Sequence, residues 1–185
     1  MPVIISMLRG VNVGGHNKIK MDALRLLYES LKLREPQTHL QSGNVLFRTE
    51  ERDLALLSKR IHSGIERLFG FRVDVILRTI PELRSAIARN PFAKRRNIEP
   101  SKLLVTFLAG EPSPEARKNV LGIKAAPEEL HIDGRELYIY FPNGMARPKL
   151  TWPILERALK ISGTGRNWNT VTKLLELAEN LESSA

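Results

Sequence analysis

The chain has 185 residues, of which 42% are hydrophobic, and a formal net charge of +9. That length allows one large domain or two small ones with a substantial apolar core. The sequence has no cysteine and no run of about eighteen apolar residues, so it excludes disulfides, thiolate chemistry, cysteine-ligated zinc and a transmembrane helix.

The first residues, Met1 to Ile5, lack the charged stretch that opens a signal peptide. We therefore expect a cytoplasmic protein with no membrane partner. The positive charge is uneven, because residues 1–100 hold 18 Lys and Arg against 10 Asp and Glu, and residues 101–185 hold 11 against 10. A basic first part favours attraction to phosphates or other anions, although a scattered basic surface can also serve solubility alone.

Hydrophobic patterning of residues 1–79 predicts alternating strands and helices. An apolar run that ends at glycine is typical of a buried strand, and leucine or isoleucine at three- and four-residue steps is typical of an amphipathic helix. The turn residues Ser42-Gly43-Asn44 predict a hairpin. The predicted elements are a strand at 3–9, a helix at 21–33, strands at 38–41 and 45–48, a helix at 52–69 and a strand at 72–79. The order βαββαβ is the ferredoxin-like plan.

A short helix from Ile80 to Arg89 comes next, and then a linker that carries the cation run Lys94-Arg95-Arg96. The first order then recurs. Its elements are a strand at 103–108, a helix at 113–121, a hairpin of 130–132 and 137–141, a helix from 152, an edge strand at 163–166 and a helix at 168–181. We therefore predict an α+β fold of two ferredoxin-like (βαββαβ) plaits in tandem, with antiparallel sheets and helices on one face. The plaits span residues 1–79 and 101–185, with the helix and linker at 80–100 between them.

The loop from Arg9 to Lys18 contains three glycines and two asparagines and leads into the first helix. In the predicted plan the first and third strands are central and antiparallel, so this loop should meet the turn at 42–44. Backbone N–H groups and a helix N-terminus would suit a phosphate or carboxylate there. The candidate anion-binding residues are Arg9, Asn12, Lys18, Gln41, Ser42 and Asn44. The alternative is that the glycines form turns and the asparagines cap the helix.

The same loop does not match known nucleotide motifs. Gly10 and Gly15 are spaced as in a P-loop, but that motif needs lysine directly after the second glycine and then a hydroxyl residue. Here Lys18 is displaced by two positions, and Ile19 follows it. A Walker ATPase is therefore not expected, and the spacing of a dinucleotide fingerprint also fails.

A second polar group precedes the last two predicted helices. Arg147 and Lys149 lie before one helix, and Arg166 and Asn167 lie before the other. Cations at a helix N-terminus oppose the helix dipole, which suggests an anionic partner. Capping by Thr151 and by Asn167 or Asn169 would explain the polar residues without a ligand.

Five stretches, spread in order over nearly the whole chain, carry a resemblance to a known family. They are Leu8 to Lys18, Gln41 to Phe47, Asn90-Pro91-Phe92, Lys149-Leu150-Thr151 and Arg166 to Val171. Together they resemble the bacterial domain-of-unknown-function family 1697. The resemblance implies a tandem pair of ferredoxin-like plaits and no established activity. Many relatives have Arg-Ser-Lys-Leu-Thr where this chain has Pro148 at the second position, and proline supplies neither the hydroxyl nor the N–H.

The function favoured by these residues is binding of an anionic ligand, either a nucleic-acid backbone or a phosphate-bearing molecule, at glycine-rich basic loops. The predicted central strands lack the exposed aromatic side chains on which RNA-recognition modules stack bases. An enzyme acting on a small phosphate- or carboxylate-bearing substrate is an alternative, although no catalytic set is evident. A structural or partner-binding protein, including a homo-oligomer, is a third. We expect no cofactor and no metal, because His16, His39, His62 and His131 have no metal-ligand spacing.

Overall fold

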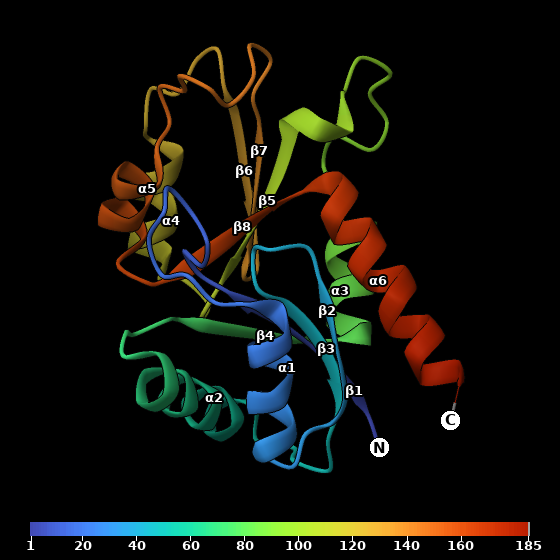
Figure 1. Ribbon diagram of the computed structural model, residues 1–185. Coiled ribbons are helices and arrows are strands. Elements are labelled where there is room, and N and C mark those ends of the chain that lie inside the picture. Colours follow the sequence, from blue (N-terminus) through green and yellow to red (C-terminus); the bar gives the residue numbers. More distant parts are fainter. Residues whose placement is uncertain (185) are drawn as a thin grey trace. The chain divides into compact units, whose positions relative to one another are not determined.

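The computed structural model describes residues 1–184 and confirms the predicted α+β plan with two four-stranded antiparallel sheets. The first sheet has the strand order β2-β3-β1-β4 and the second has β6-β7-β5-β8 (Figure 1). The elements from the start of the chain to α3 are β1 (Val3–Leu8), α1 (Met21–Ser30), β2 (Arg34–His39), β3 (Asn44–Arg48), α2 (Leu54–Phe69), β4 (Val75–Thr79) and α3 (Ile80–Ala88). The remaining elements are η1 (Pro100–Lys102), β5 (Leu103–Leu108), α4 (Pro114–Leu121), β6 (Glu129–Asp133), β7 (Glu136–Tyr140), α5 (Trp152–Leu159), β8 (Gly163–Asn167) and α6 (Trp168–Ser183).

The chain forms two compact units. Residues 1–84 together with 173–184 make the first, and residues 85–172 make the second. The boundaries fall inside α3 and α6, so each unit contains one complete sheet and part of a helix that begins in the other.

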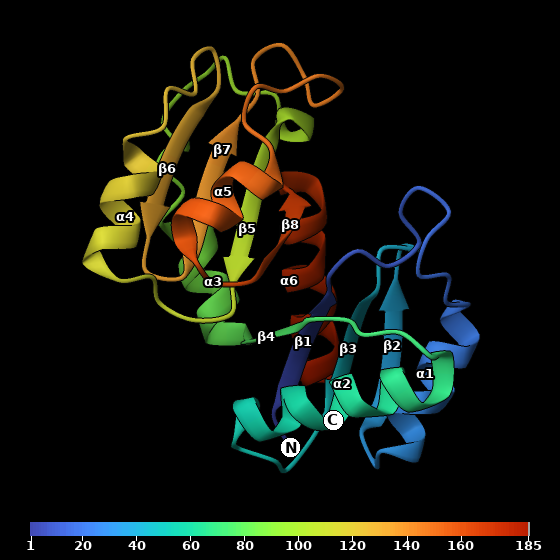
Figure 2. The ribbon, with the colours of Figure 1, turned by 90° about the vertical axis from the view of Figure 1, so that its left-hand side faces the viewer.

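The sheet of the first unit is buried on both faces. Leu8, Val45 and Phe47 belong to the core that α1 and α2 cover. The other face is covered by the C-terminal part of α6, where the Arg48 guanidinium donates to the main-chain carbonyl of Leu181 (Figures 1 and 2). Because every residue of β1 and β3 is buried, these central strands offer no open surface on which a base could stack.

The sheet of the second unit is covered in a comparable way. Leu137 and Ile139 pack in the core that α4 and α5 complete. On the opposite face the Tyr138 hydroxyl donates to the carbonyl of Ala86 in α3 at 2.6 Å. The Phe92 ring lies 5.9 Å from that of Tyr140 and covers the same face.

The predicted edge strand at 163–166 is confirmed as β8, but the prediction for β2 was wrong in its bounds. The strand lies at 34–39 rather than 38–41. Its pairing with β3 shifts between Arg34 and Gln37, and Glu35 has a φ of +51°. Pro36 removes a backbone donor in the same stretch, which an edge strand with a bulge can accommodate. Because of this irregularity, residues 34–39 lack the alternation of apolar and polar residues from which a strand is predicted.

The strand registers show that the two halves repeat the same plan. Arg78 in β4 lies opposite Ile5, and Arg166 in β8 lies opposite Val105, at the same step of each sheet. Each arginine is followed by a residue that caps the next helix: the Thr79 hydroxyl accepts from the Glu82 amide at 3.3 Å, and Asn167 does the same for α6. The duplication is therefore visible in register although the two sequences differ.

Candidate functional site

The glycine loop lies against the β2–β3 turn, as the topology predicted. The Leu8 amide donates to the carbonyl of Gly43 at 2.9 Å, and the Asn12 side chain donates to the carbonyl of Gln41 at 2.7 Å. The end of β1 and the start of β3 therefore form one composite surface.

Asn12 closes this loop by bonding to Ile19 at its far end as well as to the β2–β3 turn. Its Nδ2 also donates to the Ile19 carbonyl at 2.9 Å, and its Oδ1 accepts from the Ile19 amide at 2.9 Å. The residue has a φ of +56°, a conformation that asparagine adopts more readily than most residues. Asn12 therefore holds the shape of the loop and leaves little of its polar group for a ligand.

Replacing Asn12 by alanine is expected to destabilise the first unit by about 1–3 kcal/mol, because it removes these hydrogen bonds and because alanine tolerates a positive φ less well than asparagine. Asn12→Gly is the control, since it removes the same bonds but tolerates the backbone. Urea unfolding should place Asn12→Gly between wild type and Asn12→Ala. A loss below 0.5 kcal/mol for both variants (about the noise of a surface change) would contradict a structural role.

Several of the other predicted residues are also occupied by contacts within the protein. Arg9 pairs with Asp74 at 3.1 Å. Asn44 is buried, and its Nδ2 donates to the His39 carbonyl at 2.9 Å and to the Ser42 hydroxyl at 3.1 Å. These side chains fix the ends of the strands around the loop.

A cavity of about 590 Å³ lies beside the loop. It is lined by Asn12, Gly15, Lys18, Ile19, Lys20 and Gln41. Lys18 and Lys20 are exposed, and within the described residues 1–184 neither forms an ion pair. Lys20 was missed from the sequence, although its place two residues after Lys18 and directly before the helix is a readable signal.

The same cavity adjoins the N-terminus of α1. Lys20 occupies the N-cap position, and no side chain caps that end of the helix. Uncapped N–H groups and the positive end of the helix dipole both favour an anion. The two lysines add positive charge at the same place.

The second predicted cluster is not one exposed group, because Arg166 is buried whereas Arg147 and Lys149 are exposed. Arg166 lies within β8 and is only 7% exposed, and it donates to the Thr164 hydroxyl at 2.7 Å and to the Gly165 carbonyl at 2.9 Å. Burial lowers its pKa to about 10. Asn167 caps α6 by accepting from the Thr170 amide at 2.9 Å, which confirms the capping alternative.

Arg147 and Lys149 are exposed in the segment that leads to α5. The Lys149 amide donates to the Glu128 carboxylate at 3.3 Å, so this segment is tied down by its backbone. Thr151 occupies the N-cap position of α5, but its side chain makes no capping hydrogen bond. Arg147 and Lys149 are therefore the exposed cations of the predicted cluster, and Arg166 of β8 is not exposed with them.

Within residues 1–184, no group of three or more histidine, aspartate or glutamate side chains is arranged to hold a metal ion. His16 is exposed in the glycine loop. In the same part of the chain, no helix is both long and apolar enough to span a membrane.

These observations define an α+β protein of two tandem ferredoxin-like units, the first of which carries a basic, glycine-rich loop beside a cavity. Residues 1–138 match the family described as Protein of unknown function (DUF1697), and the chain belongs to that family. The matched range contains the glycine loop and the β2–β3 turn, whereas the motifs at 149–151 and 166–171 lie beyond it.

A solved structure is similar over nearly the full length. The conserved bacterial protein SP0830 from Streptococcus pneumoniae aligns with a TM-score of 0.72 and 18% identity, covering 96% of this chain and 98% of that chain. At that identity the likeness supports the fold alone. No curated protein matches the sequence.

Proposed function

We propose that the first unit binds a small phosphate-bearing molecule in the cavity beside the glycine loop. The observation that carries this proposal is the position of Lys18 and Lys20, two exposed lysines that line one cavity at the uncapped N-terminus of α1. The phosphate would receive charge-assisted hydrogen bonds from the lysines and from the first N–H groups of the helix. A volume of about 590 Å³ is in the range of small-molecule sites.

The structure of the loop supports a preformed site. Asn12 bonds across the loop and fixes it against Gln41, so binding would not have to order the backbone first. Gly15 has a φ of +78°, and no heavy atom lies within 4 Å of where its Cβ would stand. The backbone there is therefore open to close approach by a ligand.

The test is calorimetric titration of the full chain with inorganic phosphate, pyrophosphate and AMP. Wild-type protein is expected to bind at least one of these, and Lys18→Gln and Lys20→Gln are each expected to weaken binding roughly tenfold, the loss of one charge-assisted hydrogen bond. Arg52→Gln is the matched control, because Arg52 is exposed and lies outside the cavity.

The comparison among the probes separates the sources of the phosphate. Preference for AMP would indicate a nucleotide, and equal affinity for inorganic phosphate would indicate a free anion. The proposal is wrong if none of the three binds at millimolar concentration, or if the Lys18→Gln/Lys20→Gln variant binds as well as Arg52→Gln.

A further inference from the structure

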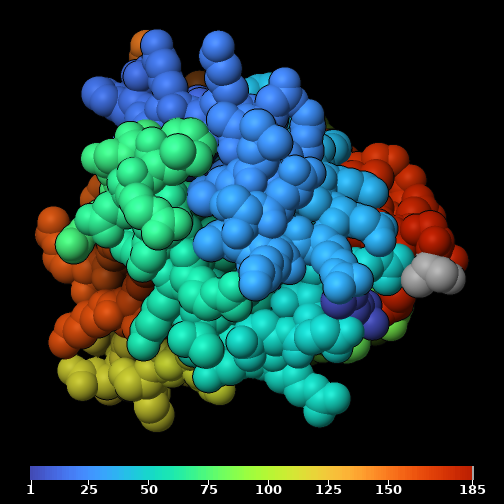
Figure 3. Space-filling view, turned by 60° about the horizontal axis from the view of Figure 1, so that its bottom comes forward, coloured from blue at the N-terminus to red at the C-terminus, as the bar shows by residue number. Residues whose placement is uncertain are grey.

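A second cationic surface lies at the opposite end of α1 from the glycine loop. Helices α1 and α2 lie side by side on the face shown in Figure 3. A Cβ on Gly64 of α2 would stand 3.1 Å from Leu27 Cδ1 and 3.4 Å from Leu31 Cδ1, so the helices approach closely where the side chain is absent. A groove of about 310 Å³ opens there and is lined by Leu31, Lys59, Arg60, Ser63, Gly64 and Arg67.

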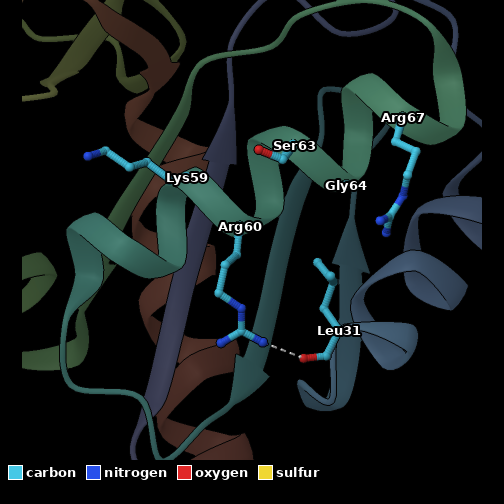
Figure 4. A pocket seen from close by; sticks show the side chains of 6 residues that line it. All are labelled: Leu31, Lys59, Arg60, Ser63, Gly64 and Arg67. Atoms are coloured by element: carbon cyan, nitrogen blue, oxygen red, sulfur yellow. Dashed lines mark hydrogen bonds between the residues drawn. The ribbon is translucent and has the colours of Figure 1, made fainter.

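Two arginines flank this groove. Figure 4 shows Arg60 and Arg67 extending from α2 toward the end of α1, with Leu31 between them, and Lys59 extending in a different direction. Arg60 donates to the Leu31 carbonyl at 3.0 Å, which satisfies a terminal carbonyl of α1. Arg67 and Lys59 are exposed, with no contact of this kind.

The charge of the groove is not neutralised by the protein. Among residues 1–184, no acidic side chain forms an ion pair with Lys59, Arg60 or Arg67. Glu66 is the only acidic residue of α2, and it is engaged by Arg72, whose Nε lies 2.9 Å from its carboxylate. The exposed cations therefore remain available to an external anion.

The spacing of the two arginines indicates a ligand with repeated charges. Arg60 and Arg67 are seven residues apart, or about 10.5 Å along a helix that rises ~1.5 Å per residue. A nucleic-acid strand carries one phosphate per ~3.4 Å of helix axis, so two cations this far apart can contact different phosphates of one strand. Ser63 also lines the groove and is exposed, so its hydroxyl can donate to a phosphate bound there.

We propose that this groove of the first unit, formed by Arg60, Ser63 and Arg67 of α2 and supported by Lys59, binds the phosphodiester backbone of a nucleic acid. The central strands β1 and β3 of this unit are buried, so bases cannot stack on them. The contact is therefore with phosphates, independent of sequence and sensitive to salt. The proposal goes beyond binding at the glycine loop and does not depend on it.

The test is fluorescence anisotropy of the full chain with a labelled 20-base-pair DNA of mixed sequence, measured from ~50 to ~200 mM salt. Wild-type protein is expected to bind at the low end. Arg67→Gln and Lys59→Gln should each weaken binding roughly three- to tenfold and reduce the slope of log affinity against log salt by about 0.9. Arg60 is left intact because it satisfies the end of α1.

Two controls make the result specific. Lys118→Gln removes an exposed charge from α4, which lies in the second unit and away from the groove in sequence, and should leave the affinity unchanged. Unfolding midpoints of all variants should match that of wild type, because none of these side chains makes a contact that holds the fold.

Three outcomes would overturn the proposal. The first is no binding of the DNA at ~50 mM salt, where phosphate contacts are strongest. The second is an equal loss in the α2 variants and in the Lys118→Gln control, which would show a general effect of net charge. The third is competition by polyglutamate as effective as that by unlabelled DNA, which would indicate an acidic protein partner.

Discussion

Replacing Gly43 by alanine is expected to lower the free energy of unfolding of the first unit by about 2–5 kcal/mol. Gly43 has a φ of +77°, where a Cβ costs about 1–2 kcal/mol. That Cβ would stand 2.9 Å from Leu8 Cβ and 3.1 Å from Leu8 Cδ1. Because Leu8 is fully buried in β1, it cannot move aside, and such overpacking typically costs a further ~1–3 kcal/mol.

Gly10→Ala provides the matched control for Gly43→Ala. Gly10 also has a positive φ, of +66°, but no heavy atom lies within 4 Å of its missing Cβ. It should therefore lose only the backbone contribution of about 1–2 kcal/mol. Urea unfolding of both variants measures the difference. Equal destabilisation would show that the contact between Leu8 and Gly43 is not tight.

The same variant bears on the proposed ligand site. Gly43 accepts the amide of Leu8, and this contact joins the glycine loop to the β2–β3 turn. If Gly43→Ala pushes the turn away from β1, the carbonyl of Gln41 moves away from Asn12 and the cavity loses one wall. We expect phosphate binding to weaken in Gly43→Ala and to persist in Gly10→Ala.

The juxtaposition of loop and turn could be predicted from sequence because it follows from topology alone. Once the order βαββαβ is read, the end of β1 must lie beside the start of β3, whichever side chains are present. The same topology puts the end of β5 beside the second hairpin, where the Leu108 amide donates to the Arg135 carbonyl at 2.9 Å. Backbone placement of this kind needs only hydrophobic periodicity and turn residues.

The role of each polar side chain could not be predicted in the same way. Arg166 was expected to offer its charge to an anion before the last helix. It lies in the predicted strand β8, but its side chain is buried there. A charged residue is normally expected to be exposed, so a buried arginine is not recognised from the sequence. Its counterpart Arg78 is also buried, so both units place an arginine inside the fold at this step of the sheet.

The α2 groove was missed for a different reason. Helical spacing predicted α2, whose apolar stripe is buried at Leu57, Ile61 and Ile65, but the charged residues on the polar face of an amphipathic helix are normally taken as solvated. Only the close approach at Gly64 shows that the polar face borders a hollow. Packing between two helices joins Leu31 to Arg60 across 29 positions in sequence, and no local pattern contains that information.

Alkaline pH is expected to destabilise each unit through one buried tyrosine. The Tyr28 hydroxyl shares a hydrogen bond of 2.8 Å with Ser6 inside the first unit, and the Tyr138 hydroxyl donates to Ala86 inside the second. Burial is the main cause that raises the pKa of both phenols well above their usual value near 10. For Tyr138 the nearby Glu136 carboxylate raises the pKa further.

The sign of the effect follows from proton binding. Above about pH 10 the tyrosines of the unfolded chain lose their protons, while the buried phenols of the folded units keep theirs. The unfolded state therefore binds fewer protons, and the free energy of unfolding falls as pH rises. The full stabilisation is present below about pH 10 and is lost above it, by about 1.4 kcal/mol per pH unit for each tyrosine.

Urea unfolding at intervals between about pH 8.5 and pH 11 measures this slope, with Tyr28→Phe/Ser6→Ala as the matched variant. This double variant removes both hydroxyls of the buried hydrogen bond, so that no unpaired hydroxyl is left in the core. Lysines also titrate in this range, so the difference between wild type and variant isolates the tyrosine. We expect the variant to lose about 1.4 kcal/mol less per pH unit in the first unit. Identical slopes would mean that the Tyr28 hydroxyl reaches solvent before the unit unfolds, and the closed face between α1 and the sheet would then have to open locally.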